Sequence, residues 1–146
     1  MERIIMRAQV FALFTAAAWG IGGYFEKRGL LLGNLPPQVG ITIRTAVALI
    51  ILAAVSAPQW KTILDASPKA LIYIVIGGGV LAGAVGMLCF YVALKGGSIT
   101  QVMPIAFTSP LFGVLMAALV GGESLQPRQL IGMALTIGGI ALVSSS

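Results

Sequence analysis

The chain of 146 residues is 58% hydrophobic and only 9% charged, whereas soluble domains average about 25% charged residues. A soluble fold would need more polar surface than this, so the composition indicates one membrane-embedded domain. The net charge of +5 is spread over single and paired basic residues between apolar runs, which excludes a concentrated nucleic-acid surface. Because histidine is absent, the commonest general base and metal ligand is missing, and we expect no bound metal or other cofactor.

The first apolar segment, residues 8–24, predicts a transmembrane helix that closes on the charged residues Glu26, Lys27 and Arg28. A basic start followed by an apolar core and small residues would also suit a signal peptide. Four further apolar segments follow, so a retained first membrane helix is the simpler interpretation.

The second segment, residues 36–57, begins at a pair of prolines and is interrupted by Arg44. The third, residues 70–94, is rich in glycine, and Gly79 and Gly83 form a GxxxG pair. In lipid, such glycines mark a face where another backbone comes close, so we assign this pair a structural role.

The fourth segment, residues 98–120, contains Pro104 and Pro110, each of which removes a backbone hydrogen bond. A membrane helix tolerates such prolines where neighbours or a water-filled cavity satisfy the freed carbonyls. We therefore expect a bent helix that lines a path through the membrane. A loop with Glu123 leads to a short fifth segment, residues 127–143, and completes a predicted all-α bundle of five transmembrane helices.

Five crossings would place the two ends of the chain on opposite sides of the membrane. With the N-terminal end inside, the inner face would hold more basic residues than the outer face, but the excess is small. Such a weak bias suits insertion in both orientations, and a single orientation is the alternative. The inner set would be Arg3, Arg7, Lys61, Lys69 and Arg128, and the outer set Lys27, Arg28 and Lys95.

Several of these residues recur in one order and spacing along nearly the whole chain. They are Trp19-Gly20 in the first helix, Arg44 in the second, Tyr91-x-Ala93-Leu94-Lys95 ending the third, Pro110 in the fourth, Gly122-Glu123 after it, and Gln129 and Gly132 into the fifth. This pattern resembles one EamA-type repeat of the drug/metabolite transporter superfamily. Most members carry two such five-helix units in inverted orientation, so the chain resembles a half-length member.

The resemblance implies a transporter of a small metabolite or drug-like substrate, acting as an exporter by alternating access in a bacterial or archaeal cytoplasmic membrane. It also implies a two-unit assembly, either an antiparallel homodimer or a pair with a second subunit. The four-helix small multidrug exporters match less well, because they rely on a carboxylate inside the first helix. No Asp or Glu falls between Ala8 and Tyr24, so we do not expect proton-for-drug exchange through such a residue.

Arg44 is the only charge well inside a predicted span, where a charge costs at least about 2.5–3.5 kcal/mol. It would bind an anionic group of the substrate, or it would pair with Glu26 or reach the nearer membrane surface. The other candidate substrate-binding residues are aromatic or polar: Trp19, Tyr91, Gln101, Thr108 and Ser109. Thr108 and Ser109 could instead satisfy backbone groups freed by the bend. The candidate structural residues are Gly79, Gly83, Pro104, Pro110 and Glu123, the last of which would fix a turn, with Arg128 nearby.

Two functions from different classes are open. The first is transport, which a cavity-facing Arg44 and a polar-lined fourth helix would favour. The second is a non-transporting membrane subunit that stabilises a larger complex, which would gain if Arg44 and Thr108 faced lipid or a solid core. An enzyme fits least, because there is no histidine and every acid falls at or beyond a predicted helix end: Glu2, Glu26, Asp65 and Glu123.

Overall fold

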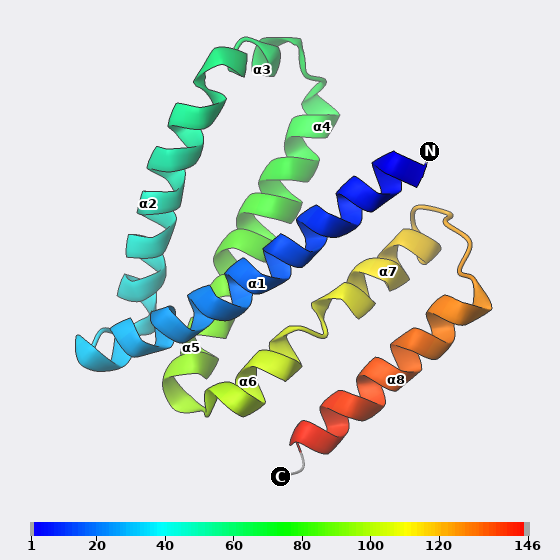
Figure 1. The fold of residues 1–146 in the computed structure, drawn as a ribbon. Coiled ribbons are helices and arrows are strands. Elements are labelled where there is room, and N and C mark those ends of the chain that lie inside the picture. Colours follow the sequence, from blue (N-terminus) through cyan, green and yellow to red (C-terminus); the bar gives the residue numbers. More distant parts are fainter. Residues whose placement is uncertain (1, 145–146) are drawn as a thin grey trace. The chain divides into compact units, whose positions relative to one another are not determined.

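A computed structural model describes residues 2–144, with side chains from residue 8 onward. Within this range it contains five helical spans that are long and apolar enough to cross a membrane, and no strand (Figure 1). This confirms the predicted all-α architecture. The spans are Ala8–Leu32, Pro37–Gln59, Pro68–Gly96, Ile99–Leu119 and Pro127–Ser144.

The chain divides into two compact units that meet in sequence at Gly96 and Gly97. Unit 1 contains the first three spans and unit 2 the last two. In unit 1 the elements are α1 (Glu2–Leu32), α2 (Pro37–Ser56), η1 (Ala57–Gln59), α3 (Thr62–Asp65), α4 (Pro68–Ile72), η2 (Tyr73–Gly86) and α5 (Met87–Gly96). In unit 2 they are α6 (Ile99–Ala106), α7 (Ser109–Leu119) and α8 (Pro127–Ser144).

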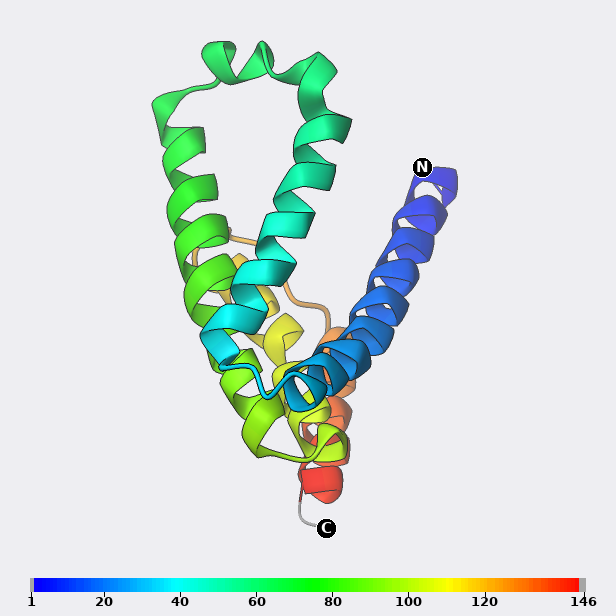
Figure 2. The same ribbon diagram turned by 90° about the vertical axis from the view of Figure 1, so that its left-hand side faces the viewer.

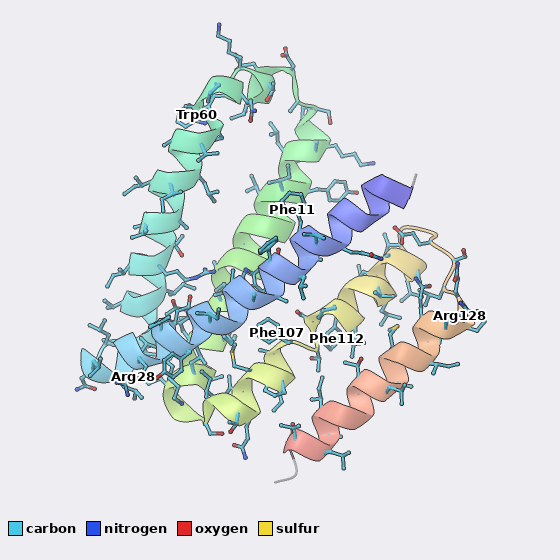
Figure 3. All side chains as sticks on the ribbon, viewed as in Figure 1. Phe11, Arg28, Trp60, Phe107, Phe112 and Arg128 are labelled. Atoms are coloured by element: carbon cyan, nitrogen blue, oxygen red, sulfur yellow. The ribbon has the colours of Figure 1, made fainter. Side chains whose placement is uncertain are left out.

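Most large apolar side chains of the described residues are exposed, including Phe11 on α1 and Phe112 on α7, both labelled in Figure 3. In water, so large an exposed apolar surface would drive aggregation. In a bilayer the same surface contacts lipid tails, which are as apolar as the side chains themselves. The outward apolar faces therefore agree with the membrane assignment from composition.

In unit 1, α1, α2 and α5 pack against one another at the end where α1 stops and α2 begins (Figure 2). The buried apolar side chains of the described residues gather there: Leu30 from α1, and Tyr91 and Leu94 from α5. Toward the α3 loop, α2 and the third span diverge. The packed end is thus the part of unit 1 where side chains from different helices are held in fixed positions.

The C-terminus of α1 explains why this end is well defined. Asn34 adopts the left-handed conformation with φ of 45°, the Leu35 N–H donates to the Leu30 carbonyl (2.9 Å), and the Asn34 N–H donates to Leu31 (3.2 Å). These two bonds form a Schellman motif, which satisfies carbonyls that would otherwise lack partners. The first helix therefore runs eight residues beyond its predicted end, and the charged residues 26–28 lie inside it.

The third span contains a long π-helical segment, η2, which includes Gly79 and Gly83. A Cβ placed at Gly83 would lie 2.9 Å from the Gly78 carbonyl oxygen of the same segment, so glycine is needed there. Within the described residues, no other helix comes within 4 Å of such a Cβ at Gly79 or Gly83. A closely packed partner helix at this pair stays a prediction.

In unit 2, the fourth span bends as a break between α6 and α7, at Phe107 and Thr108. Pro104 lies inside α6, whereas Pro110 lies in the first turn of α7. Since Pro110 has no N–H to donate to the Ala106 carbonyl, the α-helical ladder cannot continue across this point. α8 packs against α6 within the unit.

Candidate functional site

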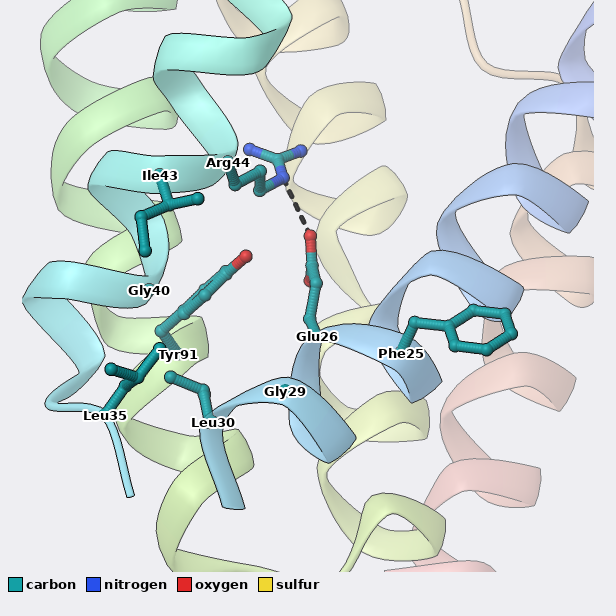
Figure 4. A pocket seen from close by; sticks show the side chains of 9 residues that line it. All are labelled: Phe25, Glu26, Gly29, Leu30, Leu35, Gly40, Ile43, Arg44 and Tyr91. Atoms are coloured by element: carbon teal, nitrogen blue, oxygen red, sulfur yellow. Dashed lines mark ion pairs between the residues drawn. The ribbon is translucent and has the colours of Figure 1, made fainter. Parts of the chain in front are cut away.

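The packed end of unit 1 holds an ion pair within its membrane spans. The Arg44 Nε on α2 lies 2.8 Å from Glu26 Oε1 on α1, and the two side chains are 37% and 20% exposed (Figure 4). Glu26 is about 9 Å from the end of α1, and Arg44 about 10 Å from the start of α2, from the helical rise per residue. Both charges therefore lie well inside their spans, where each needs a partner.

Tyr91 on α5 completes this group. Its ring is buried, with the residue 2% exposed, and its hydroxyl points toward Glu26 and Arg44, close enough to interact electrostatically with both (Figure 4). The packed ring holds the hydroxyl in place, so the site combines one cation, one carboxylate and one neutral hydrogen-bond donor.

A shallow cavity of about 290 Å³ opens beside these three side chains. This is close to the lower end of the range of about 300–1,000 Å³ for small-molecule sites, which combine apolar walls with a few placed polar groups. The cavity is lined by Phe25, Glu26, Gly29, Leu30, Leu35, Gly40, Ile43, Arg44 and Tyr91 (Figure 4).

Lys95 stabilises one wall of the site through a hydrogen bond. Its Nζ donates a hydrogen bond to the Leu35 carbonyl oxygen at 2.8 Å, joining the end of α5 to the turn after α1. Leu35 and Leu30, the two ends of the Schellman motif, both line the cavity. The turn after α1 therefore shapes this wall.

Gly40 on α2 permits the close approach of Tyr91. A Cβ at position 40 would lie 2.5 Å from Leu30 Cδ2 and 3.0 Å from Tyr91 Cε1. Gly40→Ala should therefore displace these side chains and destabilise unit 1 by about 1–3 kcal/mol, the usual range for overpacking. A lowered midpoint of thermal unfolding in detergent would report this.

Gly113→Ala on α7 is the matched control, since a Cβ at that glycine meets nothing within 4 Å. We expect the midpoint of this variant to stay at or above the wild-type value. Equal effects of the two substitutions would contradict the packing role of Gly40.

The EamA-like transporter family model matches residues 6–145, which is nearly the entire chain. The chain belongs to this family. It is also 27% identical over 138 residues to a Sinorhizobium sp protein named "Uncharacterized transporter in cobO 3'region", and the match covers 93% of this chain and 95% of that relative. No solved structure matches the chain significantly. The family indicates a transporter, as the relative's name also does, and the five apolar spans of the described residues agree with a multi-pass membrane protein.

Of the substrate-binding residues predicted for this EamA-like chain, the structure brings together Arg44 and Tyr91. Trp19, on α1 in the same unit, is 57% exposed and does not line the cavity. Gln101, Thr108 and Ser109 belong to unit 2, so their place relative to Arg44 stays a prediction.

Within unit 2, the Thr108 hydroxyl donates to the Ile105 carbonyl oxygen at 2.8 Å. The Thr108 N–H donates to the same oxygen at 3.1 Å, so the hydroxyl adds a second local bond to the backbone at the break, close to the alternative given above for Thr108. In the turn after α7, the Glu123 N–H donates to the Ala117 carbonyl oxygen at 3.1 Å. Across this described turn, Glu123 forms no ion pair with Arg128.

Glu26 is the functional candidate that sequence reasoning places outside the site. The sequence indicates it only as a structural mate of Arg44, at a charged boundary beyond the first helix. Its position in α1 overturns that boundary, because α1 continues to Leu32. The signal that could have found it is the Asn34-x-Pro36 sequence, since Asn favours a left-handed helix end and proline often follows one.

Proposed function

We propose that the protein exports a small molecule carrying an anionic group, such as a carboxylate, and that Arg44 binds this group. The observation that supports this most directly is the Glu26–Arg44 pair beside a mostly apolar cavity, inside the spans of an EamA-like chain. A guanidinium offers several N–H donors in a rigid fork that matches an oxyanion. No covalent chemistry is needed, because binding and release suffice for transport, so we do not propose an enzyme.

We infer that two five-span units work together by alternating access, most simply as an antiparallel homodimer and otherwise as a pair with a second subunit. Inverted repeats around a shared site are the general design of secondary transporters. The relative from Sinorhizobium sp supports this, since a match that covers 95% of it corresponds to a single set of five spans. We place the assembly in a bacterial or archaeal cytoplasmic membrane, with the lipid bilayer around its apolar faces.

The competing function, a non-transporting subunit, would gain support if Arg44 and Thr108 faced lipid or a solid core. Arg44 lines a cavity instead, which favours transport. Thr108 is engaged with a local carbonyl and supports neither function. Support for transport therefore comes from unit 1.

Metabolite profiling tests the proposed function. Cells that lack the protein should retain a small set of low-molecular-mass anions that cells with the protein release, as measured by untargeted mass spectrometry. Each such anion should then move across proteoliposomes that contain the purified protein. Indistinguishable profiles, together with no flux of any cell-extract anion in vesicles, would refute transport.

A further inference from the structure

The polar groups of the cavity suggest how binding is coupled to a second ion. We propose that Glu26 and the anionic group of the substrate compete for Arg44, and that Glu26 takes up one proton when the substrate group replaces it. This inference rests on the proposed function, because it requires Arg44 to bind the substrate. It assigns Glu26 a role in coupling that is separate from support of the fold.

The geometry of the ion pair leaves room for an exchange of partners. Glu26 contacts the guanidinium through Nε, at 2.8 Å, and Figure 4 shows the two terminal nitrogens on the far side of the group from Glu26. An incoming oxyanion can therefore reach Arg44 before Glu26 has left. An oxyanion also prefers two parallel N–H donors, so its best position competes with the present contact.

Charge balance determines what happens to Glu26 next. The ion pair is neutral, and adding a monoanion would leave one uncompensated negative charge in a region of low dielectric constant. Two carboxylates that share one site do not both stay ionised at low cost. A proton from water on Glu26 restores neutrality, with the arginine cation facing the substrate anion and a neutral carboxylic acid beside them.

The other groups around Glu26 in unit 1 do not supply the positive charge that this proton brings. From α2 it faces Arg44, and from α5 it faces Tyr91, a neutral donor that can serve either carboxylate. Lys95 on α5 donates to the Leu35 carbonyl oxygen, at the turn after α1. Lys27, the adjacent cation on α1, is not among the residues that line the cavity.

The consequence is electroneutral movement of the anion together with one proton. The gradients of the anion and the proton then set the direction of net flow, and export follows when the anion accumulates inside. Because binding takes up a proton, the affinity for the anion should rise as the pH falls. One linked proton corresponds to about a tenfold change in affinity per pH unit.

Methanesulfonate is a suitable probe, because it is the anion of a strong acid and carries no proton of its own. The full-length protein in detergent is titrated with sodium methanesulfonate by calorimetry, and proton uptake is followed with an indicator dye in weak buffer. For the wild type at neutral pH we expect uptake approaching one proton per bound anion, with affinity increasing about tenfold per unit decrease in pH.

Glu26→Gln removes the competitor and keeps the side-chain size. It should bind methanesulfonate more tightly than the wild type at neutral pH, without proton uptake and without the pH dependence. Asp65→Asn, at the exposed end of α3 outside the spans, should behave like the wild type. Circular dichroism and gel filtration check that each variant is folded.

Three results would overturn the inference: wild-type binding without proton uptake, an unchanged pH dependence in Glu26→Gln, or no saturable binding by Glu26→Gln. The wild-type measurement stands alone if the variant fails to fold. Flux of the cellular anions in vesicles separates the two proposals, since flux that persists without proton movement refutes the coupling and leaves transport in place.

Discussion

Arg44→Ala is expected to reduce anion flux in proteoliposomes to the background of vesicles without protein. The variant loses the cation that binds the substrate and leaves the Glu26 carboxylate without its partner at 2.8 Å. In the proposed bound state Arg44 and the anion form a charge pair shielded from water, and removing one member of such a pair typically costs about 2–5 kcal/mol. A loss of roughly 30-fold or more in apparent affinity follows. Radiolabelled anion uptake at matched protein density measures it.

A double variant separates binding from support of the fold. Glu26→Gln/Arg44→Gln removes both charges, so no uncompensated charge is left in the membrane, and it should insert and unfold like the wild type. It should still fail to transport, because the anion has lost its cation. Restored flux in the double variant would show that Arg44 serves only to neutralise Glu26. Arg128→Ala, in the exposed first turn of α8, is the control and should keep wild-type flux.

The five spans could be predicted from the sequence alone. A run of about 20 apolar residues satisfies its own backbone as a helix, and in lipid few alternatives are available. The break in the fourth span is equally predictable, since Pro110 removes a specific hydrogen bond. The long π-helical segment η2 was not predicted, because a small change in hydrogen-bond register leaves no mark in hydrophobicity.

The end of α1 was predicted too early, because the apolar run ends before the helix does. Residues 26–28 are charged, so a hydrophobic segment stops there, yet nothing in them breaks a helix. The actual stop is the Asn34 turn, with Pro36 after it. This difference of eight residues moves Glu26 from a boundary into the site, where it becomes a candidate for proton coupling.

The sequence predicted the kind of site but only some of its residues. Arg44 was identifiable alone, since a charge inside a span demands an explanation. Tyr91 lies far from it in sequence and joined it only through the packing of α5 on α2. Gly40 carried no signal of its own, because its role depends on the ring that it makes room for. Residue type identifies candidates, whereas helix rotation decides which of them share a cavity.

A tandem fusion of two copies is expected to transport when the linker is short and to fail when the linker contains an extra transmembrane helix. The five spans of residues 2–144 are an odd number, so they would put the two ends of this range on opposite sides of the membrane in each copy. A short flexible linker therefore forces the second copy into the inverted orientation, whereas one more crossing forces the same orientation. If the substrate site needs an inverted pair, the fusion with the extra helix should fall to background flux.

Single-cysteine labelling makes this test specific to orientation. In a Cys89→Ala background, a cysteine at Asp65 in the α3 loop of either copy reports the side of the membrane that it faces, through an impermeant thiol reagent. In the short-linker fusion, the two copies should be labelled from opposite sides of the membrane. If the unlinked protein inserts in both orientations, about half of its molecules should be labelled from each side. Full flux from the same-orientation tandem would rule out the antiparallel assembly. That result would leave the Glu26–Arg44 site untouched. It would show that one copy of the chain, or a parallel pair of copies, completes the transport path.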